Sequence, residues 1–360
     1  MRTVLFHSVG GDGLGHLARS TAIALELRRT GRAFPVLLTE SRDTTLAEAS
    51  GLPFCTLPAR YHVADPARWE GGADTGDSLF RTLLLRVVEE LAPSLFVHDT
   101  LIYADVQAEL AARGVSQALV MRHRPTAGAL ASAWSGLRTV VLAEDFGAEA
   151  PEVTLGPVVR RVGPIVRSLP QALDESAVRA RYELAPNRFT VVIANGGGGV
   201  LERDEFLPLV GRALVRAADQ GVSAQVVAVV GPLYRGRLDA LARVPDLRLY
   251  SMLPDFLELC ACAQLVLSRG GYNSAHELAA LGVPTLCVPT FRHHDRQDER
   301  ILRAERQGTA LRLAAADPEA LSAQIADLYR APWYNGPRPG MQPHGAAEAA
   351  LALLDSMEQR

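Results

Sequence analysis

The chain has 360 residues, 48% of them hydrophobic and 21% charged, which is enough apolar material for two globular cores of ordinary size. A formal net charge of −3 provides no general attraction to nucleic acid or to an anionic membrane surface, and all 37 basic residues are arginine, which excludes any mechanism that needs a lysine. No apolar run reaches the length of about 18 residues that a membrane span requires, so we expect no transmembrane helix.

Strand-like and helix-like segments alternate through the first half of the sequence. Short runs of consecutive apolar residues are separated by longer segments with helical periodicity, and such runs are typical of parallel strands covered on both faces. The predicted strands are 4–9, 34–39, 95–98, 117–121 and 139–143, and the predicted helices are 17–29, 79–91 and 104–112.

The alternation restarts after an interruption at 156–170, which contains three prolines and Gly163 and which we interpret as a linker. A stretch rich in proline and glycine, 332–345, precedes a final amphipathic helix at 346–357. Between them we predict strands 190–194, 225–230, 247–250, 265–268 and 285–288, with helices before the second and third strands and at 274–281 and 297–306.

Two successive series of strands and helices predict an α/β protein of two Rossmann-like, doubly wound domains that face each other across a cleft. We place the first domain at residues 1–163 and the second at 164–335. The remaining residues, 336–360, are expected to form a helix that packs back across the domains.

The amino terminus and the cysteines indicate the cellular compartment. The chain begins directly with a strand, without a charged leader or a cleavable apolar stretch. Four scattered cysteines predict no disulfide framework, and Cys260 and Cys262 lack a second pair of ligands at zinc spacing. We therefore expect a cytoplasmic protein with reduced cysteines and no bound metal, for which peripheral membrane association stays open.

The segment GGDGLGH at 10–16 follows the first strand and opens the first helix. Glycines such as Gly13 and Gly15 let a ligand approach the backbone, and a helix amino terminus favours negative charge. One interpretation is a dinucleotide-binding loop of an oxidoreductase, with Glu40 at the end of the second strand as its ribose-binding acid. Against this, His16 occupies the third glycine position, where its side chain crowds the approach of helix to strand.

His16 is a candidate general base because it lies at the carboxyl end of a strand, where ligands bind in such sheets, and a histidine there can take a proton from an attacking hydroxyl. Such a base needs an orienting carboxylate, and Asp99 follows the strand 95–98 on the same sheet edge. The alternative is that His16 only opens a helix and Asp99 only starts a turn.

Two glycine segments in the second half are candidates for a phosphate site. Gly196, Gly197 and Gly198 lie in the segment ANGGGG, which follows a strand and precedes a helix. In the segment SRGGYNSAHEL at 268–278, two glycines again join a strand to a helix, and small polar residues start the helix. The donors of a first helical turn suit a diphosphate, although four glycines can also be a flexible turn.

Glu277 stands one turn beyond Ser274, where a carboxylate can accept both ribose hydroxyls of a nucleotide. A capping box explains the same spacing but does not explain Gly270 and Gly271. A short strand closed by proline then delivers the loop 291–298, whose acids and Gln297 can bond sugar hydroxyls. The adjacent His293 and His294 raise a metal hypothesis, but a solvated loop is the simpler interpretation.

The pattern SRGGxNSxxEL, followed by GVP, HxDRQ and Gly308, resembles the donor-binding half of GT-B glycosyltransferases. It is similar to the lineage that contains the lipid II-forming N-acetylglucosaminyltransferase and to bacterial natural-product glycosyltransferases. The loop at 10–16 resembles the family's GGxGGH loop with one residue more, and for that reason we do not assign the lipid II substrate. The acceptor region at 61–77 matches nothing recognisable.

The resemblance implies an inverting, metal-independent transferase that moves a sugar from a UDP or dTDP sugar to a hydroxyl of a small-molecule or lipid-linked acceptor. The absence of a D-x-D motif agrees with the absence of a metal. The implied catalytic residues are His16 and Asp99, beside the acceptor-side glycines Gly13 and Gly15. The implied donor-binding residues are Gly196, Gly197, Gly198, Met252, Leu253, Gly270, Gly271, Asn273, Ser274, Glu277, Gln297 and Asp298.

Two alternatives keep the donor site. A nucleotide-sugar hydrolase would use water in place of the acceptor, and a non-catalytic subunit would bind the nucleotide sugar and activate a partner. The sequence leaves open the donor sugar, its base, the acceptor, the stereochemical outcome and the oligomeric state.

Overall fold

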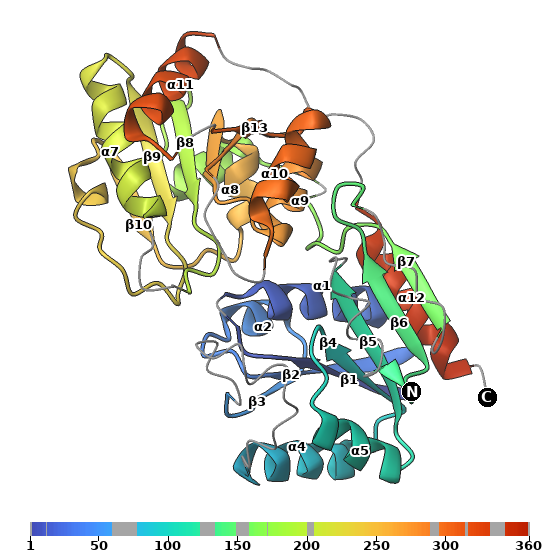
Figure 1. Ribbon diagram of the computed structural model, residues 1–360. Coiled ribbons are helices and arrows are strands. Elements are labelled where there is room, and N and C mark those ends of the chain that lie inside the picture. The colour runs from blue at the N-terminus through green and yellow to red at the C-terminus, as the bar shows by residue number, and fades with distance from the viewer. Residues whose placement is uncertain are drawn as a thin grey trace. The chain divides into compact units, whose positions relative to one another are not determined.

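The computed structural model describes residues 2–11, 13–59, 78–122, 134–148, 158–170, 172–199, 205–288, 295–313, 316–331 and 343–358. The chain divides into two compact units (Figure 1), each built on one parallel sheet. Unit 1 comprises Met1–Arg167 together with Pro343–Arg360, and unit 2 comprises Ser168–Gln342.

Unit 1 contains a seven-stranded sheet in the order β3-β2-β1-β4-β5-β6-β7. Its strands are β1 (Arg2–Ser8), β2 (Ala33–Thr39), β3 (Phe54–Thr56), β4 (Leu95–Asp99), β5 (Ser116–Arg122), β6 (Thr139–Ala143) and β7 (Val158–Val162). Its helices are α1 (Gly15–Arg29), α2 (Thr45–Ser50), α4 (Ser78–Leu91), α5 (Ala104–Ala112) and α12 (Gly345–Glu358). The helices α4 and α5 cover one face of the sheet, and α1 and α2 lie on the other (Figure 1). The strand order reverses at β1, which is where ligands bind in doubly wound sheets.

Unit 2 contains a six-stranded sheet in the order β10-β9-β8-β11-β12-β13. Its strands are β8 (Phe189–Ala194), β9 (Ala224–Val229), β10 (Leu247–Tyr250), β11 (Leu265–Ser268), β12 (Thr285–Cys287) and β13 (Leu311–Arg312). Its helices are α6 (Glu175–Arg181), α7 (Phe206–Asp219), α8 (Phe256–Ala261), α9 (Tyr272–Leu281), α10 (Gln297–Arg306) and α11 (Pro318–Arg330).

Strand β8 shows why these strands carry consecutive apolar residues. Val191 and Ile193 pack with α7 and α11 on one face of the sheet. Val192 and Ala194 pack with α6, α8 and α9 on the other face. Because successive side chains point to opposite faces, both faces must be apolar, and each fully buried aliphatic side chain contributes about 1.5–3 kcal/mol to the stability of the fold.

The structure differs from the predicted elements in several places. Residues 158–162 form β7, which pairs with β6, although we interpreted them as linker. This edge strand is largely exposed and contains two arginines, so its sequence has no continuous apolar run. The prediction also missed α2, β3, α6, α8 and β13, which are too short to give a periodic signal. It missed the longer helix α11 as well, although Asp317 and Pro318 are typical residues for the start of a helix. The helix predicted before β10 is replaced by the single 3₁₀ turn Leu241–Arg243, in a segment interrupted by Gly231 and Pro232.

Helix α12 returns to unit 1 and packs against α1, β6 and β7. Leu353 and Leu354 are buried there, 0% and 2% exposed. Arg138 Nη1 donates to the carbonyl of Ser356 at 3.2 Å, and the Gly163 amide donates to Glu348 Oε2 at 2.7 Å. The end of the described chain therefore completes the unit in which the chain begins.

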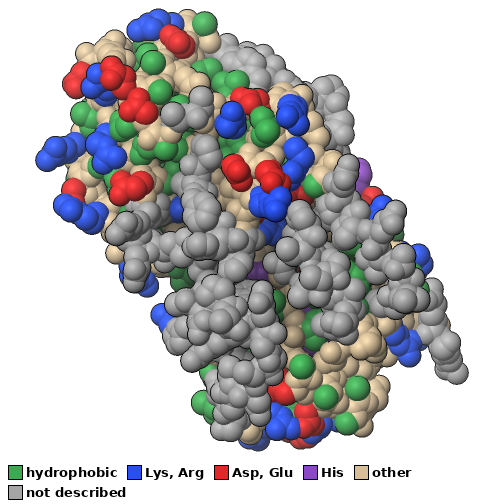
Figure 2. Space-filling model, viewed as in Figure 1, with side chains coloured by type: hydrophobic (Ala, Val, Ile, Leu, Met, Phe, Trp, Pro, Cys, Tyr) green, Lys and Arg blue, Asp and Glu red, His purple; other side chains and the backbone are tan. Residues whose placement is uncertain are grey.

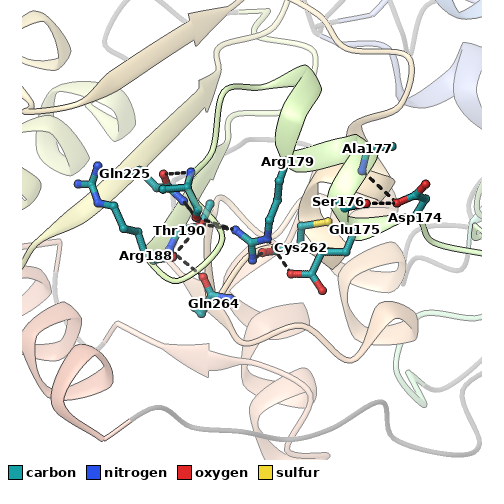
Figure 3. Close-up of polar contacts among 11 residues, drawn as sticks. Asp174, Glu175, Ser176, Ala177, Arg179, Arg188, Thr190, Gln225, Cys262 and Gln264 are labelled. Carbon is teal, nitrogen blue, oxygen red and sulfur yellow. Dashed lines mark hydrogen bonds and ion pairs between the residues drawn. The ribbon is translucent and has the colours of Figure 1, made fainter.

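A buried polar network joins the amino ends of three strands of unit 2 (Figure 3). Arg179 of α6, 5% exposed, donates through Nη2 to the Cys262 carbonyl at 3.0 Å, just before β11. The Thr190 amide donates to Gln264 Oε1 at 2.8 Å, and Gln225 Nε2 donates to Thr190 Oγ1 at 2.8 Å. The network satisfies polar groups that would otherwise be buried without partners, at the sheet edge opposite to the one where ligands bind in such folds.

The surface agrees with the composition. On the face drawn in Figure 2, acidic and basic side chains of described residues are intermixed over unit 2. Among the described helices, none combines the length and hydropathy that crossing a bilayer would require.

Candidate active site

The carboxyl ends of β1 and β4 form the first candidate site. These neighbouring strands pair in parallel, with Ser8 opposite Asp99. The glycine loop after β1 leads into α1, whose first residue is Gly15 and whose second is His16. Gly13 lies in the loop and is partly exposed.

The structure brings the predicted pair together. His16 Nδ1 lies 2.7 Å from Asp99 Oδ1, and the two side chains are 27% and 2% exposed, respectively. An exposed imidazole edge backed by a buried carboxylate is the arrangement expected of a base and its orienting group.

Arg19 is a third member of this site that the sequence analysis missed. Its Nε donates to Asp99 Oδ2 at 3.0 Å, and its Nη2 donates to Asp99 Oδ1 and, at 2.6 Å, to Thr100 Oγ1. Ser20 Oγ lies 3.3 Å from Asp99 Oδ2. A bidentate guanidinium–carboxylate contact fixes both the charge and the orientation of the aspartate. The spacing of three residues from His16 along α1 is the signal that could have identified it.

Thr100 adopts a left-handed backbone conformation, with φ of 67°. A β-branched residue rarely occupies this region, and such strain costs on the order of 1–3 kcal/mol. The conformation is held by the Thr100 amide, which donates to the Val120 carbonyl at 2.8 Å, and by Thr100 Oγ1, which donates to Asp99 Oδ1 at 3.0 Å. Backbone strain therefore occurs directly after the carboxylate that orients His16, as it often does at functional sites.

Asp99 is ionised at neutral pH. Burial alone would raise its pKa, but the Arg19 guanidinium and then His16 outweigh burial and hold the pKa well below its ordinary value. A carboxylate only accepts, so neutral His16 donates its Nδ1 proton to Asp99. The lone pair of Nε2 is then available to take a proton from a ligand.

Gly11 lies beside this outer edge of His16. A Cβ placed on Gly11 would lie 3.2 Å from His16 Cδ2 and 3.5 Å from His16 Nε2. The absence of a side chain at position 11 thus keeps the Nε2 edge open to a ligand.

Glu40 has a different role from the one that a dinucleotide-binding loop would give it. The side chain is 2% exposed, and its Oε1 lies 2.9 Å from His7 Nε2 and accepts from the Tyr103 hydroxyl at 2.9 Å. A carboxylate engaged in this way is not presented to a ribose, so the geometry disfavours the dinucleotide interpretation.

The carboxyl ends of β8 and β11 form the second candidate site. The turn Gly197–Gly198 after β8 packs against the turn after β9, where the Leu233 amide donates to the Gly197 carbonyl at 3.1 Å. A Cβ on Gly231 would lie 2.4 Å from the backbone of Gly197 and Gly198. A Cβ on Gly198 would lie 2.5 Å from the Val230 carbonyl oxygen. The glycine segment is therefore a turn fixed by its neighbours rather than a loose loop.

Gly270 and Gly271 connect β11 to α9, and Gly271 precedes the first helical residue. Asn273 and Ser274 lie in the first turn of α9 and are partly exposed. Amide groups in a first turn have no partner within the helix, so this turn suits an anion. Glu277 follows one turn later on α9 and is 2% exposed.

Gln297 and Asp298 are the first two residues of α10 in unit 2. Gln297 is buried and its Nε2 donates to Asp295 Oδ2 at 3.2 Å, whereas Asp298 is exposed. Arg300, which the sequence analysis missed, donates to Asp295 Oδ1 at 2.7 Å and to the Gly270 carbonyl at 3.2 Å. Asp295 therefore links Gln297 to an arginine that contacts the glycine turn before α9.

Met252 and Leu253 follow β10. Met252 is partly exposed, while the Leu253 side chain packs in the core beneath α6, α8 and α9. Only their backbone was predicted to meet a base, and that role stays a prediction.

The remaining predictions concern metal and acceptor. Across the described ranges, no three or more His, Cys, Asp or Glu side chains group in a way that could hold a metal ion. His293, His294 and the acceptor region 61–77 lie outside the described residues.

Comparison with known proteins supports a common class. Residues 198–350 match the protein family described as Glycosyltransferase family 28 C-terminal domain. A UDP-N-acetylglucosamine--N-acetylmuramyl-(pentapeptide) pyrophosphoryl-undecaprenol N-acetylglucosamine transferase of Acidothermus cellulolyticus is 28% identical over 296 residues, which cover 78% of this chain and 76% of the relative.

Solved structures extend the likeness to the whole chain. The glycotransferase of kitacinnamycin aligns with a TM-score of 0.65 at 16% identity, covering 98% of both chains. MurG of Acinetobacter baumannii aligns with a TM-score of 0.57 at 16% identity, covering 100% of both chains.

The two parallel α/β units and these matches define the class: the chain has the GT-B fold and is a glycosyltransferase. More particularly, residues 198–350 carry the C-terminal domain of glycosyltransferase family 28, and the chain is similar both to MurG-type enzymes and to natural-product glycosyltransferases. The suspected family and fold class are thereby confirmed.

Proposed function

We propose that the chain transfers a sugar from a nucleoside diphosphate sugar to a hydroxyl of a lipid-linked or small-molecule acceptor, with inversion at the anomeric carbon. The observation that carries this proposal is the 2.7 Å contact of His16 with a buried, ionised Asp99 at the carboxyl ends of β1 and β4. The match of residues 198–350 to a glycosyltransferase domain supports a donor site in unit 2.

UDP-N-acetylglucosamine is the first donor to test, because the curated relatives are named for its use. Sugars carried by dTDP come second. In this proposal the first turn of α9 and the turn after β8 hold the diphosphate, and Glu277 binds the ribose. The assigned donor contacts are Gly196, Gly197, Gly198, Gly270, Gly271, Asn273 and Ser274 for the diphosphate, Gln297 and Asp298 for the sugar, and the backbone of Met252 and Leu253 for the base.

The chemical step follows from the tautomer of His16. The Nε2 lone pair takes the proton of the acceptor hydroxyl while its oxygen attacks the anomeric carbon. The bond from that carbon to the diphosphate oxygen breaks, and the nucleoside diphosphate leaves with the electron pair. Asp99 stays ionised and stabilises the imidazolium that forms.

We propose that the reaction needs no divalent metal. Charge on the departing diphosphate would be offset by the first-turn amides and the amino-terminal dipole of α9. The physical support is that these donors lie on a helix whose preceding turn is held by Arg300 and is therefore already organised for an anion.

The test is release of UDP from UDP-N-acetylglucosamine, measured with and without a panel of lipid-linked and small-molecule acceptors, in the presence of EDTA. We expect acceptor-dependent release that EDTA does not abolish, and an anomerically inverted product by NMR. His16→Ala should lower kcat by about 10²–10⁴ while leaving UDP affinity unchanged, because the base acts only on the acceptor.

Three results would contradict parts of this proposal. Equal release of free sugar without any acceptor would make the chain a nucleotide-sugar hydrolase. Retention of configuration would exclude direct attack by the acceptor, and loss of activity in EDTA would exclude metal independence.

A further inference from the structure

Two buried polar side chains join the ends of neighbouring strands beneath the glycine turns of unit 2. Strands β8 and β11 pair with Ala194 opposite Ser268, so the next residues, Asn195 and Arg269, leave the sheet side by side. Arg269 Nη1 donates to Asn195 Oδ1 at 2.9 Å. Asn195 is 3% exposed and Arg269 is 8% exposed.

Asn195 also bonds the end of a third strand, β9. Its Nδ2 donates to the Val230 carbonyl at 2.7 Å, and its backbone amide donates to the Val229 carbonyl at 3.2 Å. A single asparagine therefore connects the ends of β9 and β8 directly, and the end of β11 through Arg269.

Each of these three strand ends is followed at once by a glycine turn. Gly196, Gly231 and Gly270 have φ of 71°, 89° and 72°, respectively. Asn195, Val230 and Arg269 are the residues that directly precede these turns. The contact between Asn195 and Arg269 therefore sets the spacing between the turn after β8 and the turn before α9. These are the two turns to which the proposed function assigns the diphosphate.

The pair also carries charge. Arg269 Cζ lies 5.6 Å from the centroid of the Phe206 ring, and its Nη1 donates to the Asn195 side chain. A guanidinium stays protonated when buried, and a fixed cation in a poorly solvated position acts on nearby anions more strongly than an exposed one.

We propose that Asn195 and Arg269 are positioning residues for the donor diphosphate. They hold the two glycine turns at the separation that the diphosphate requires, and Arg269 adds a positive charge beneath them. Neither residue is assigned a contact with the ligand. The inference rests on the proposed function and adds to it two residues that select for the diphosphate rather than for the nucleoside.

The opposite edge of the same sheet provides a matched control. Arg179 is also a buried arginine of unit 2, and it bonds groups at the amino ends of β8 and β11 (Figure 3). Replacing either arginine with methionine removes a buried guanidinium from one end of β8 and β11. Only the Arg269 substitution acts at the carboxyl ends of the strands, where the glycine turns follow.

The experiment compares Arg269→Met, Arg269→Lys, Asn195→Ser and Arg179→Met with the wild type. Dissociation constants for UDP and for uridine are measured by competition calorimetry, and Tm is measured in parallel. We expect Arg269→Met and Asn195→Ser to weaken UDP about tenfold or more and to change uridine affinity less than about twofold. Arg269→Lys should fall between, because it keeps the charge but not the planar fork. Arg179→Met should lower Tm and leave the ratio of the two affinities unchanged.

Two outcomes would overturn the inference, and they are distinguishable. If the wild type binds UDP and the Arg269 and Asn195 variants keep its ratio of UDP to uridine affinity, the pair is purely structural, and the proposed function stands. If Arg269→Met does not fold, the Asn195→Ser result decides. If the wild type binds neither UDP nor, in a second titration, dTDP, the proposed donor site itself is wrong and the inference falls with it.

Discussion

Among the partners of Asp99, Arg19 and His16 have different functions. Arg19 binds the carboxylate through Nε and Nη2, and His16 contacts Oδ1, the oxygen that also accepts from Arg19 Nη2. The Arg19 guanidinium stabilises the ionised carboxylate in its buried position, and the carboxylate then holds the His16 imidazole in one orientation. Arg19 thus acts on the base through the orienting group.

Replacing Arg19 tests this chain of contacts. Arg19→Met leaves Asp99 buried without its strongest partner, so we expect kcat/KM to fall about 10- to 100-fold, the range typical when an outer partner of a functional histidine is lost. Arg19→Lys should recover part of the loss. Steady-state kinetics at saturating donor measure the effect, and UDP affinity should not change. Full activity of Arg19→Met would show that Asp99 needs no second partner.

His98 gives a pH-dependent prediction. Its Nε2 lies 2.9 Å from Gln117 Oε1, and burial lowers its pKa to about 3, although the Gln117 hydrogen bond opposes the shift and His7 adds to it. Below the ordinary pKa of 6.5 the unfolded chain binds a proton here that the folded chain does not bind until about pH 3. The neutral histidine therefore contributes stability above pH 6.5, and this contribution decreases by about 1.4 kcal/mol per pH unit on acidification.

The comparison is between wild type and His98→Asn in urea unfolding at several pH values. We expect the free energy of unfolding of the wild type to decrease more steeply than that of the variant as the pH falls below 6.5. Parallel curves would mean that His98 is protonated in the folded state.

At the scale of elements, the donor site depends on turns that pack against one another. The turn after β9 takes no proposed part in ligand binding, yet Gly231 approaches the backbone of the turn after β8 too closely for any side chain. The conformation of the turn after β8 thus depends on its packing against the turn after β9.

Gly231→Ala should therefore weaken UDP binding by displacing Gly197 and Gly198. Gly221→Ala is a matched control, because Gly221 has the same φ of 89° but a Cβ added there would have no other atom within 4 Å. Both variants should lose stability through the strained backbone, by about 1 kcal/mol or more. Calorimetry should show weaker UDP binding only for Gly231→Ala, and equal affinities in both variants would refute the packing argument.

The sequence predicts most of the elements that have a clear period and misses the short and exposed ones, and it also misses the 13-residue helix α11. Strands such as β8 are recognisable because both faces are buried, whereas β7 is an exposed edge strand whose arginines resemble a linker. His16 and Asp99 could be paired because adjacent parallel strands end on one edge. Arg19 had only its spacing of three residues from His16 as a signal. Arg269 could not be assigned, because an arginine after a strand is expected to be solvent-exposed until its buried partner is known.

At the scale of the whole molecule, α12 ties the end of the described chain to the unit that contains the proposed base. The helix that carries its buried leucines packs against α1, β6 and β7, so its loss would uncover apolar surface on unit 1. The stability of unit 1 thus depends on a segment that follows unit 2 in the sequence.

Leu353→Ala should lower the stability of unit 1 by about 2–5 kcal/mol, since the side chain is 0% exposed. Leu351→Ala on the same helix is the control, because Leu351 is 53% exposed. Thermal unfolding with and without UDP separates the units: the transition that UDP raises should be unaffected by Leu353→Ala. A loss of stability confined to the UDP-sensitive transition would contradict the assignment of α12 to unit 1.

The return of α12 has a consequence for biosynthesis. The strands of unit 1 leave the ribosome before unit 2, but the helix that covers α1, β6 and β7 is translated only after all of unit 2. Domains fold as units as their residues emerge. Unit 2 can therefore finish folding before the last helix of unit 1 has been translated. Synthesis starts with unit 1, but unit 2 is the first unit whose residues are all available for folding.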